Sequence, residues 1–187
     1  LVNGAVGYDF IRDDFVPNDE IGHGTATGGT VIGGYRGKAP LTVIHNKIFG
    51  SQNVASYYGA LLAINSAIDS ESDIINMSWG IIQDNPPIAL ECAMRRAEAK
   101  NIVVITSAGN ENAPLDFSPQ WPAAFSDASY KFDNMLTVGS MVYPDFDISE
   151  DPVKALFSSF SGNLVDVSAY LTSASPDRMG TSQDEVV

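Results

Sequence analysis

Hydrophobic positions along the chain follow two different periods, and the middle of the sequence shows the change between them most clearly. Residues 41–48, LTVIHNKI, are rich in β-branched and apolar types, which predicts a strand. The segment 54–70, VASYYGALLAINSAIDS, has helical spacing instead. It predicts a helix, and the side chains that we expect to pack inward are Val54, Tyr57, Leu61, Ile64 and Ile68.

The alternation of strands and helices continues along the chain. Residues 73–80, DIINMSWG, predict a buried strand, 86–100 a helix with prolines at its entry, and 101–110, NIVVITSAGN, another strand. Two short strands are predicted later, in MLTVGSMV and NLVDVSAY. The order β, α, β, α, β predicts an α/β fold with a mostly parallel sheet flanked by helices. Without repeats or a linker, residues 1–187 are expected to form a single domain.

The charge and the single cysteine exclude several classes of function. With 10 basic and 23 acidic residues the net charge is −13, so a nucleic acid backbone would be repelled. The excess of acidic residues is better explained by a role in solubility than by an acidic cleft that binds basic substrates. No apolar run approaches the roughly 20 residues that span a membrane. Because Cys92 is the single cysteine of the chain, an intrachain disulfide and a cysteine-based metal site are excluded. Its thiol is expected to be a small buried group.

The two histidines lie in different contexts. His23 stands in GHGTATGG, where the glycine spacing is close to that of a dinucleotide-binding loop. Such a loop must follow a strand, whereas the residues before Gly22 are acidic, include Pro17 and predict a loop. A catalytic role for His23 is therefore favoured over a phosphate site. His45 falls within an apolar strand pattern and is expected to be structural.

Candidates for the other parts of a nucleophilic site lie further along the chain. A nucleophilic serine needs a base within hydrogen-bond reach and donors directed at the oxyanion that it creates. Ser182 in MGTSQ could be exposed on a tight turn, and Asn110 in SAGNEN could donate from its side-chain amide at a strand end. In an open parallel sheet the ligand crevice lies at the carboxyl ends of the strands, where NMSWG and SAGNEN are predicted to end.

Taken together and in this order, these segments resemble the subtilisin-like serine proteases, the subtilases. GHGTATGG, NMSWG, SAGNEN and GTSQ are similar to the family's histidine, substrate-binding, oxyanion and nucleophile motifs, and QWPAAF and LFSSFSG to later landmarks. The resemblance implies a three-layer α/β catalytic domain that hydrolyses polypeptide substrates. It assigns His23 as general base, Ser182 as nucleophile and Asn110 to the oxyanion hole. It also implies secretion or a place in the cell envelope.

The same resemblance implies where a peptide would bind. The chain of the substrate would lie along Ser78, Trp79 and Gly80, with backbone hydrogen bonds. Residues Ser107, Ala108 and Gly109 would form a wall of the pocket. Trp79 beside that pocket would favour apolar substrate side chains, and a tryptophan packed in the core is the alternative interpretation.

The sequence departs from the family pattern in front of the histidine. The family's aspartate lies in a strand-end D-S-G or D-T-G motif, which is absent before His23. None of Asp9, Asp13, Asp14 or Asp19 is predicted to follow an apolar strand. Only five residues follow Ser182, where the family has a long helix. We therefore expect a catalytic domain truncated at both ends, with the aspartate in a missing N-terminal segment and little activity in this chain alone.

No cofactor or metal is expected. Asp133 and the acidic cluster YPDFDISED could suggest calcium, but their spacing matches no binding loop and predicts a solvated acidic loop. Two other functions stay open: a catalytically inactive relative that binds peptides or partners, and a nucleotide-binding α/β protein.

Overall fold

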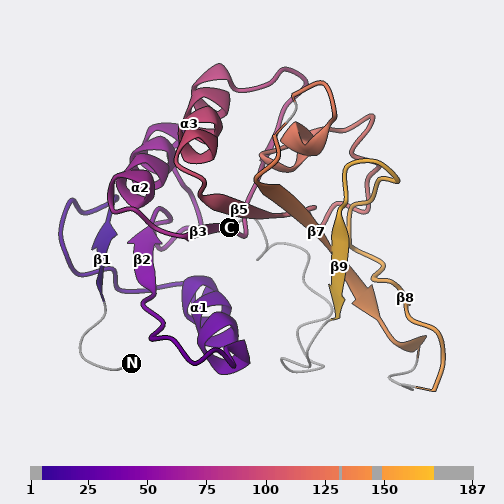
Figure 1. Ribbon diagram of the computed structural model, residues 1–187, viewed down its shortest axis with the longest axis horizontal. Coiled ribbons are helices and arrows are strands. Elements are labelled where there is room, and N and C mark those ends of the chain that lie inside the picture. The colour runs from indigo at the N-terminus through magenta and orange to yellow at the C-terminus, as the bar shows by residue number, and fades with distance from the viewer. Residues whose placement is uncertain (1–5, 131, 145–148, 171–187) are drawn as a thin grey trace. The chain divides into compact units, whose positions relative to one another are not determined.

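The computed structural model describes residues 6–130, 132–144 and 149–170 (Figure 1). The chain divides into two compact units, one ending at Ser72 and the other beginning at Asp73. Each unit is described by itself. The single domain expected for residues 1–187 stays a prediction.

The N-terminal unit is built on a pair of parallel strands with a helix on each face. The His45 ring lies against Gly28, where an added β-carbon would come within 2.6 Å of the ring. The neighbouring Asn46 donates from its side chain to the carbonyl of Ala63 (3.3 Å). Because successive strand residues point to opposite faces, the two helices cover opposite sides of the pair. The elements are β1 (Val6–Asp9), α1 (His23–Gly34), β2 (Ile44–Lys47) and α2 (Tyr57–Asp69).

Helix α2 begins three residues later than the apolar pattern that predicts it. Ser56 ends the preceding extended segment, and its hydroxyl accepts a hydrogen bond from the Gly59 N–H (2.9 Å), as an N-cap does. Val54 therefore lies outside the helix and is 65% exposed, and Tyr57 is 40% exposed, so the expected burial of both is wrong. The helix packs inward mainly through small side chains with Ile64 and Ile68: its buried residues are Gly59, Ala60, Ala63, Ile64, Ala67 and Ile68.

The C-terminal unit contains a larger and mostly parallel sheet (Figure 1). Its described strands run in the order β3, β5, β7, with β8 and β9 both pairing with β7. Only the pair of β7 with β8 is antiparallel in this sheet, so the predicted α/β class with a mostly parallel sheet is confirmed. The strands are β3 (Ile74–Met77), β5 (Val103–Ser107), β7 (Met135–Val142), β8 (Val153–Lys154) and β9 (Val167–Tyr170).

Strand β3 is shorter and less buried than its sequence predicts. Ile75 and Met77 are buried, but Ile74 is 57% exposed because successive side chains point to opposite faces. The chain then leaves this sheet at residues 78–80. It next forms β4 (Ile81–Ile82), which pairs antiparallel with β6 (Gln120–Trp121).

Helix α3 (Ile88–Ala99) begins directly after the two prolines that predict its entry. Its buried residues are Leu90, Ala93, Met94 and Ala97, which form one stripe at helical spacing. Cys92 lies off that stripe and is exposed, so the expectation of a buried thiol is wrong. A single apolar side chain in a helix is buried only if its position falls on the packed face.

An aromatic cluster forms part of the core of the C-terminal unit. Phe125, in the 3-10 helix Ala123–Ser126, has no exposed surface. Its ring centroid lies 4.5 Å from that of Trp121 and 5.0 Å from that of Tyr130. This packing supports the short β4 and β6 pair, whose position matters for the site below.

Candidate active site

His23 is the first residue of α1, and its helix is capped by an aspartate four residues earlier. Gly22 takes a left-handed conformation (φ 90°) and provides no side-chain cap. Asp19 supplies the missing acceptor: its carboxylate accepts from the N–H groups of Ile21 (3.0 Å), Gly22 (2.8 Å) and Thr25 (2.7 Å), and from the Thr25 hydroxyl (2.6 Å). Burial raises the pKa of Asp19, but these hydrogen bonds outweigh it and lower the pKa to about 2.

The His23 ring is half-buried and lacks an aspartate partner among the described residues. Its Nδ1 lies 3.4 Å from the Thr27 hydroxyl, one turn along the same helix. Burial lowers the pKa of His23, and the negative charge of Asp19 opposes that shift. An imidazole that stays neutral below its usual pKa is suited to accept a proton.

The geometry of this helix start argues against a phosphate site. The residues directly before Gly22 form bends and not a strand. The amides of Gly22 and Thr25 already donate to Asp19. A phosphate would have to displace a carboxylate from these amides, so a dinucleotide-binding loop of the usual kind does not form here.

Asp9 is an acidic residue whose position the sequence did not predict correctly. It is the last residue of β1 and has no exposed surface, so the expectation that it does not follow a strand is wrong. Its carboxylate accepts from the Lys47 ammonium (2.8 Å) and from the N–H groups of Ile11 (2.8 Å) and Arg12 (3.0 Å). Burial raises the pKa of Asp9, and these hydrogen bonds reverse the shift and lower it. The carboxylate thus balances a largely buried lysine.

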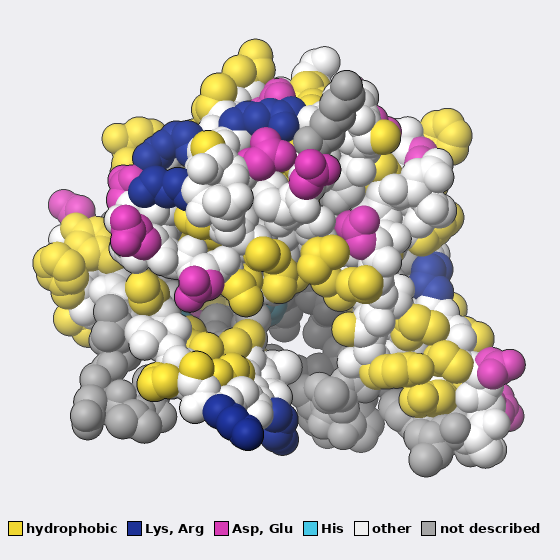
Figure 2. Space-filling view, in the orientation of Figure 1, with side chains coloured by type: hydrophobic (Ala, Val, Ile, Leu, Met, Phe, Trp, Pro, Cys, Tyr) yellow, Lys and Arg dark blue, Asp and Glu magenta, His cyan; other side chains and the backbone are white. Residues whose placement is uncertain are grey.

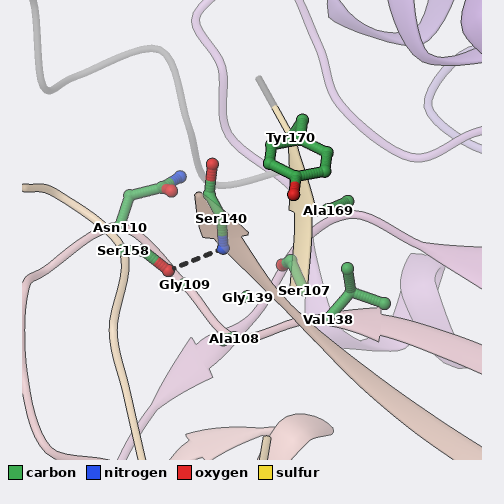
Figure 3. Close-up of a pocket in the computed structure, with 10 residues that line it drawn as sticks. All are labelled: Ser107, Ala108, Gly109, Asn110, Val138, Gly139, Ser140, Ser158, Ala169 and Tyr170. Carbon is green, nitrogen blue, oxygen red and sulfur yellow. Dashed lines mark hydrogen bonds between the residues drawn. The ribbon is translucent and has the colours of Figure 1, made fainter. Parts of the chain in front are cut away.

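Asn110 follows the end of β5 and borders a pocket of about 290 Å³ (Figure 3). The chain turns at Gly109, which has a φ of 96° that side-chain-bearing residues rarely adopt. In Figure 3 the side chains of Asn110 and Ser140 extend toward the same open region. The pocket is lined by Ser107, Ala108, Gly109, Asn110, Val138, Gly139, Ser140, Ser158, Ala169 and Tyr170.

A later segment of the chain, residues 156–162 with the sequence LFSSFSG, holds this turn in place. Ser159 donates from its N–H to the carbonyl of Gly109 (2.9 Å). Asn112 donates from its N–H to the carbonyl of Phe157 (2.7 Å). The Ser158 hydroxyl accepts from the N–H of Ser140 (3.0 Å), the bond drawn in Figure 3. The first two bonds give the Asn110 turn a defined position, and the third ties residues 156–162 to β7.

Residues 78–80 continue from β3 beside the end of β5, because β3 and β5 are paired in parallel. The Ser78 hydroxyl accepts from the Asn76 side-chain amide (2.9 Å). Trp79 is 9% exposed, which favours the interpretation that its ring belongs to the core. The C-terminal unit therefore brings residues 78–80 and 107–110 to the same end of neighbouring strands.

The remaining predicted site residues lie elsewhere. His23 belongs to the N-terminal unit, and Ser182 lies outside the described residues. Within the described ranges no group of three or more His, Cys, Asp or Glu side chains could hold a metal ion. Asp133 is exposed, and its N–H donates to Glu98 (3.3 Å). Residues 145–148 of the acidic cluster are outside the described residues.

Acidic side chains are spread over the surface on the face drawn in Figure 2. This distribution suits a charge that keeps the protein soluble. None of the described helices is both long and apolar enough to cross a membrane.

Comparison with known proteins identifies the class. The Peptidase S8 or subtilase family matches residues 7–183, and this chain belongs to the subtilase family. The crystal structure of a cold adapted subtilisin-like serine proteinase superposes with a TM-score of 0.68 at 26% identity, covering 89% of this chain and 55% of that one. The expected subtilisin-like α/β fold is thereby confirmed.

Individual relatives agree with this assignment. Subtilisin-like protease 2 of Plasmodium falciparum is 31% identical over 141 residues, covering 71% of this chain and 10% of that protein. Thermitase of Thermoactinomyces vulgaris is 27% identical over 191 residues, covering 94% of this chain and 61% of that protein. The chain thus spans from about a tenth to about three fifths of these relatives.

The relatives do not share one cellular location. Major intracellular serine protease of Bacillus subtilis is 32% identical, covering 65% of this chain and 41% of that protein. Minor extracellular protease Vpr of the same organism is 28% identical, covering 56% of this chain and 14% of that protein. Family membership therefore does not establish secretion, which stays a prediction.

Proposed function

We propose that this chain is part of a serine endopeptidase in which Ser182 attacks the peptide carbonyl carbon. His23 accepts the proton of the Ser182 hydroxyl and transfers it to the leaving amine as the carbon–nitrogen bond breaks. Water, deprotonated by His23, then releases the acyl group and restores Ser182. The negative oxygen formed in each step accepts hydrogen bonds from the Asn110 side chain and the Ser182 N–H.

Family membership across residues 7–183 is the observation that carries this proposal. Local geometry supports it at two points. Asn110 borders a pocket on a turn that is anchored by backbone hydrogen bonds. The pKa of His23 is lowered by burial, which keeps the imidazole available as a base. The substrate backbone would pair along Ser78, Trp79 and Gly80, with residues 107–109 as the facing wall.

The third member of the triad belongs to the same proposal. Two carboxylates of the N-terminal unit, those of Asp9 and Asp19, already accept hydrogen bonds from other donors. We therefore propose that an aspartate from polypeptide outside these 187 residues orients His23 in the whole protein.

Labelling with a fluorophosphonate tests the proposal directly, because such probes react with an activated serine. The full-length protein should be labelled at Ser182, and the Ser182→Ala variant should not. The Ser129→Ala variant is the matched control, since Ser129 is an exposed turn residue, and it should be labelled like the wild type. A folded full-length protein that stays unlabelled would contradict the endopeptidase function.

A second function is favoured by the environment of His23. The described residues give its ring only the Thr27 hydroxyl as a polar partner. A subtilase without an orienting aspartate could still bind extended peptides along residues 78–80. That function predicts peptide binding by the full-length protein, measured by calorimetry, without labelling of Ser182 and without cleavage.

A further inference from the structure

Lys154 is a basic residue at a position that the sequence did not single out. It is the last residue of β8, which pairs with β7. A lysine ammonium has three N–H donors. Three acceptors lie within hydrogen-bond distance of it: the side-chain oxygen of Asn112 (2.9 Å) and the carbonyls of Ala155 (2.9 Å) and Ser158 (2.8 Å). Lys154 thus connects residues 156–162 with the turn that carries Asn110.

The two carbonyl acceptors belong to residues that are almost completely buried. Ala155 is 1% exposed and Ser158 is 2% exposed. A polar group in such a place costs free energy when it loses its donor, because solvent barely reaches it. The ammonium also lies 5.2 Å from the centre of the Phe160 ring, whose face attracts a cation. These contacts give the ammonium of Lys154 a defined position.

One peptide unit links Lys154 to the turn of Asn110. The carbonyl of Ser158 accepts from the ammonium, and the N–H of Ser159, in the same peptide plane, donates to the carbonyl of Gly109 (2.9 Å). A hydrogen bond at one end of a peptide unit polarises it and strengthens the bond at the other end. The ammonium therefore strengthens the bond to Gly109, the residue directly before Asn110. Ser158 also lines the pocket that Asn110 borders (Figure 3).

A second link passes through Asn112, two residues after Asn110. Asn112 has a left-handed backbone (φ 49°), a conformation that asparagine tolerates better than most residues. Its N–H donates to the carbonyl of Phe157 (2.7 Å), and its side-chain oxygen accepts from Lys154. The turn is thus held before Asn110 by Gly109 and after it by Asn112, and the ammonium of Lys154 contributes to both attachments.

We propose that Lys154 is a positioning residue for the oxyanion hole: its ammonium holds the turn of residues 109–112, so that the Asn110 amide is in place before the reaction begins. This inference rests on the proposed endopeptidase function, in which Asn110 donates to the oxyanion. A donor that is fixed in advance stabilises the transition state better than one that must be ordered during the reaction. Loss of the ammonium should therefore lower kcat and leave substrate binding unchanged.

The first test replaces Lys154 in the full-length protein by methionine, which keeps an apolar stem and removes the ammonium. Lys154→Met should lower kcat about tenfold, less than the 10²- to 10³-fold expected for the loss of Asn110 itself. KM should change by less than about twofold, because the effect belongs to the transition state. Lys154→Arg keeps a cationic donor and should recover most of the lost kcat.

The measurement uses a fluorogenic peptide substrate. The rate is divided by the amount of serine that a fluorophosphonate labels at saturation, so that only folded molecules with an activated serine are counted. Lys38→Met, at an exposed position of the N-terminal unit, is the matched control and should retain the kcat and KM of the wild type.

The second test determines whether the effect passes through Asn110. In an Asn110→Ala background the turn no longer carries the side-chain donor, so Lys154→Met should change kcat by less than about twofold there. A lysine that only stabilised the fold would lower kcat by the same factor in both backgrounds. A folded Lys154→Met variant with the wild-type kcat, or with equal losses in the two backgrounds, would overturn the inference.

A further variant removes the acceptor instead of the donor. Asn112→Gly keeps a backbone that adopts the left-handed conformation and deletes the side-chain oxygen that Lys154 contacts. It should lower kcat about threefold when Asn110 is present, in the range of one lost hydrogen bond, and leave kcat unchanged in the Asn110→Ala background. If Lys154→Met does not fold, a folded Asn112→Gly variant with the wild-type kcat would overturn the inference in its place.

The two proposals fail in different ways. If a fluorophosphonate does not label the folded wild type, the endopeptidase function fails and the positioning inference fails with it. If the wild type is labelled at Ser182 and cleaves the peptide, but the effect of Lys154→Met does not depend on Asn110, only the positioning inference is overturned.

Discussion

The segments around His23 and Asn110 are held in place to very different degrees within their own units. In α1 the buried residue is Gly28, and Val31 and Ile32 are more than two fifths exposed. Figure 2 shows hydrophobic side chains at the surface where Figure 1 draws this helix. The Asn110 turn, by comparison, follows a strand with buried side chains and is anchored to residues 156–162.

This difference indicates which half of the proposed machinery is preorganised. Catalytic donors are effective when the surrounding structure fixes them before the reaction. The Asn110 turn meets this condition within the C-terminal unit. The start of α1, which carries His23, is held by the Asp19 cap and by the contact of Gly28 with His45.

Substitution of His23 and of Asn110 should give the largest effects on kcat, and the loss should be greater for His23. In the full-length protein His23→Ala should lower kcat by about 10⁶-fold, and Asn110→Ala by about 10²- to 10³-fold. Both magnitudes are those of subtilisin, another member of this family, and are carried over to this protein by that relationship. They are measured with a peptide substrate.

Thr30→Ala and Asn163→Ala, both at exposed positions, are the controls and should retain kcat. An Asn110→Ala variant that loses as much activity as His23→Ala would contradict the separate roles of base and oxyanion donor.

Truncation of a core side chain should distinguish the packing of the two regions. Phe125→Ala should lower the free energy of unfolding by about 3–5 kcal/mol, because it removes a fully buried aromatic ring. Val31→Ala, on α1 and 43% exposed, should change it by no more than about 0.5 kcal/mol. Urea denaturation followed by circular dichroism measures both. Similar losses in the two variants would show that α1 is packed more tightly than its exposure indicates.

The Asp19 cap should make a contribution of intermediate size to the stability of the N-terminal unit. Asp19→Ala should destabilise the protein by about 1 kcal/mol, the usual size of a lost helix cap. Because the pKa of Asp19 falls to about 2 in the folded state, its contribution should be present above about pH 4 and be lost as the pH falls toward 2. Thermal unfolding at several pH values measures this. Asp116→Ala, at an exposed position, is the control: it keeps the Asp19 cap and should retain the pH dependence of the wild type.

The pKa of His23 should show the smallest effect, but it gives the sharpest test of the aspartate that is proposed to lie outside these 187 residues. In the 187-residue chain the pKa of His23 should lie below 6.5, because burial disfavours the charged ring. Asp19→Asn should lower it further, because a negative charge that favours the protonated ring is removed. The stability that the neutral ring contributes should be lost as the pH falls through this lowered pKa.

Nuclear magnetic resonance of the imidazole protons measures these values. In the full-length protein a partner aspartate should raise the pKa of His23 above that of the 187-residue chain. Equal values in the two proteins would argue against an aspartate supplied from outside these residues.

Local sequence patterns predicted most of the regular elements. The parallel strands around Ile44–Lys47 and Val103–Ser107, and the helix after Pro87, were all expected from periodicity and from breaker residues. Met135–Val142 forms a strand over the same eight residues that predict it. Such elements depend on side chains close together in the sequence, and so they can be recognised there.

Three residues illustrate what the pattern could not show. Asp9 looked like part of an acidic loop, but it is buried at a strand end because Lys47, on the neighbouring strand, neutralises it. Cys92 looked apolar and buried, but its helix packs by another face. Gln120 stands in QWPAAF, a segment similar to a family landmark, but the sequence did not show that its buried side chain lies against the glycines at positions 80 and 109.

The sequence by itself determined the family, the order of the elements and the residue types needed for peptide hydrolysis, because these follow from motifs and short-range periodicity. Only the tertiary structure decided which polar groups are buried and what they contact. Those contacts join strands that are distant in the sequence, as Gln120 joins the segments of Gly80 and Gly109, and no local pattern encodes such a meeting.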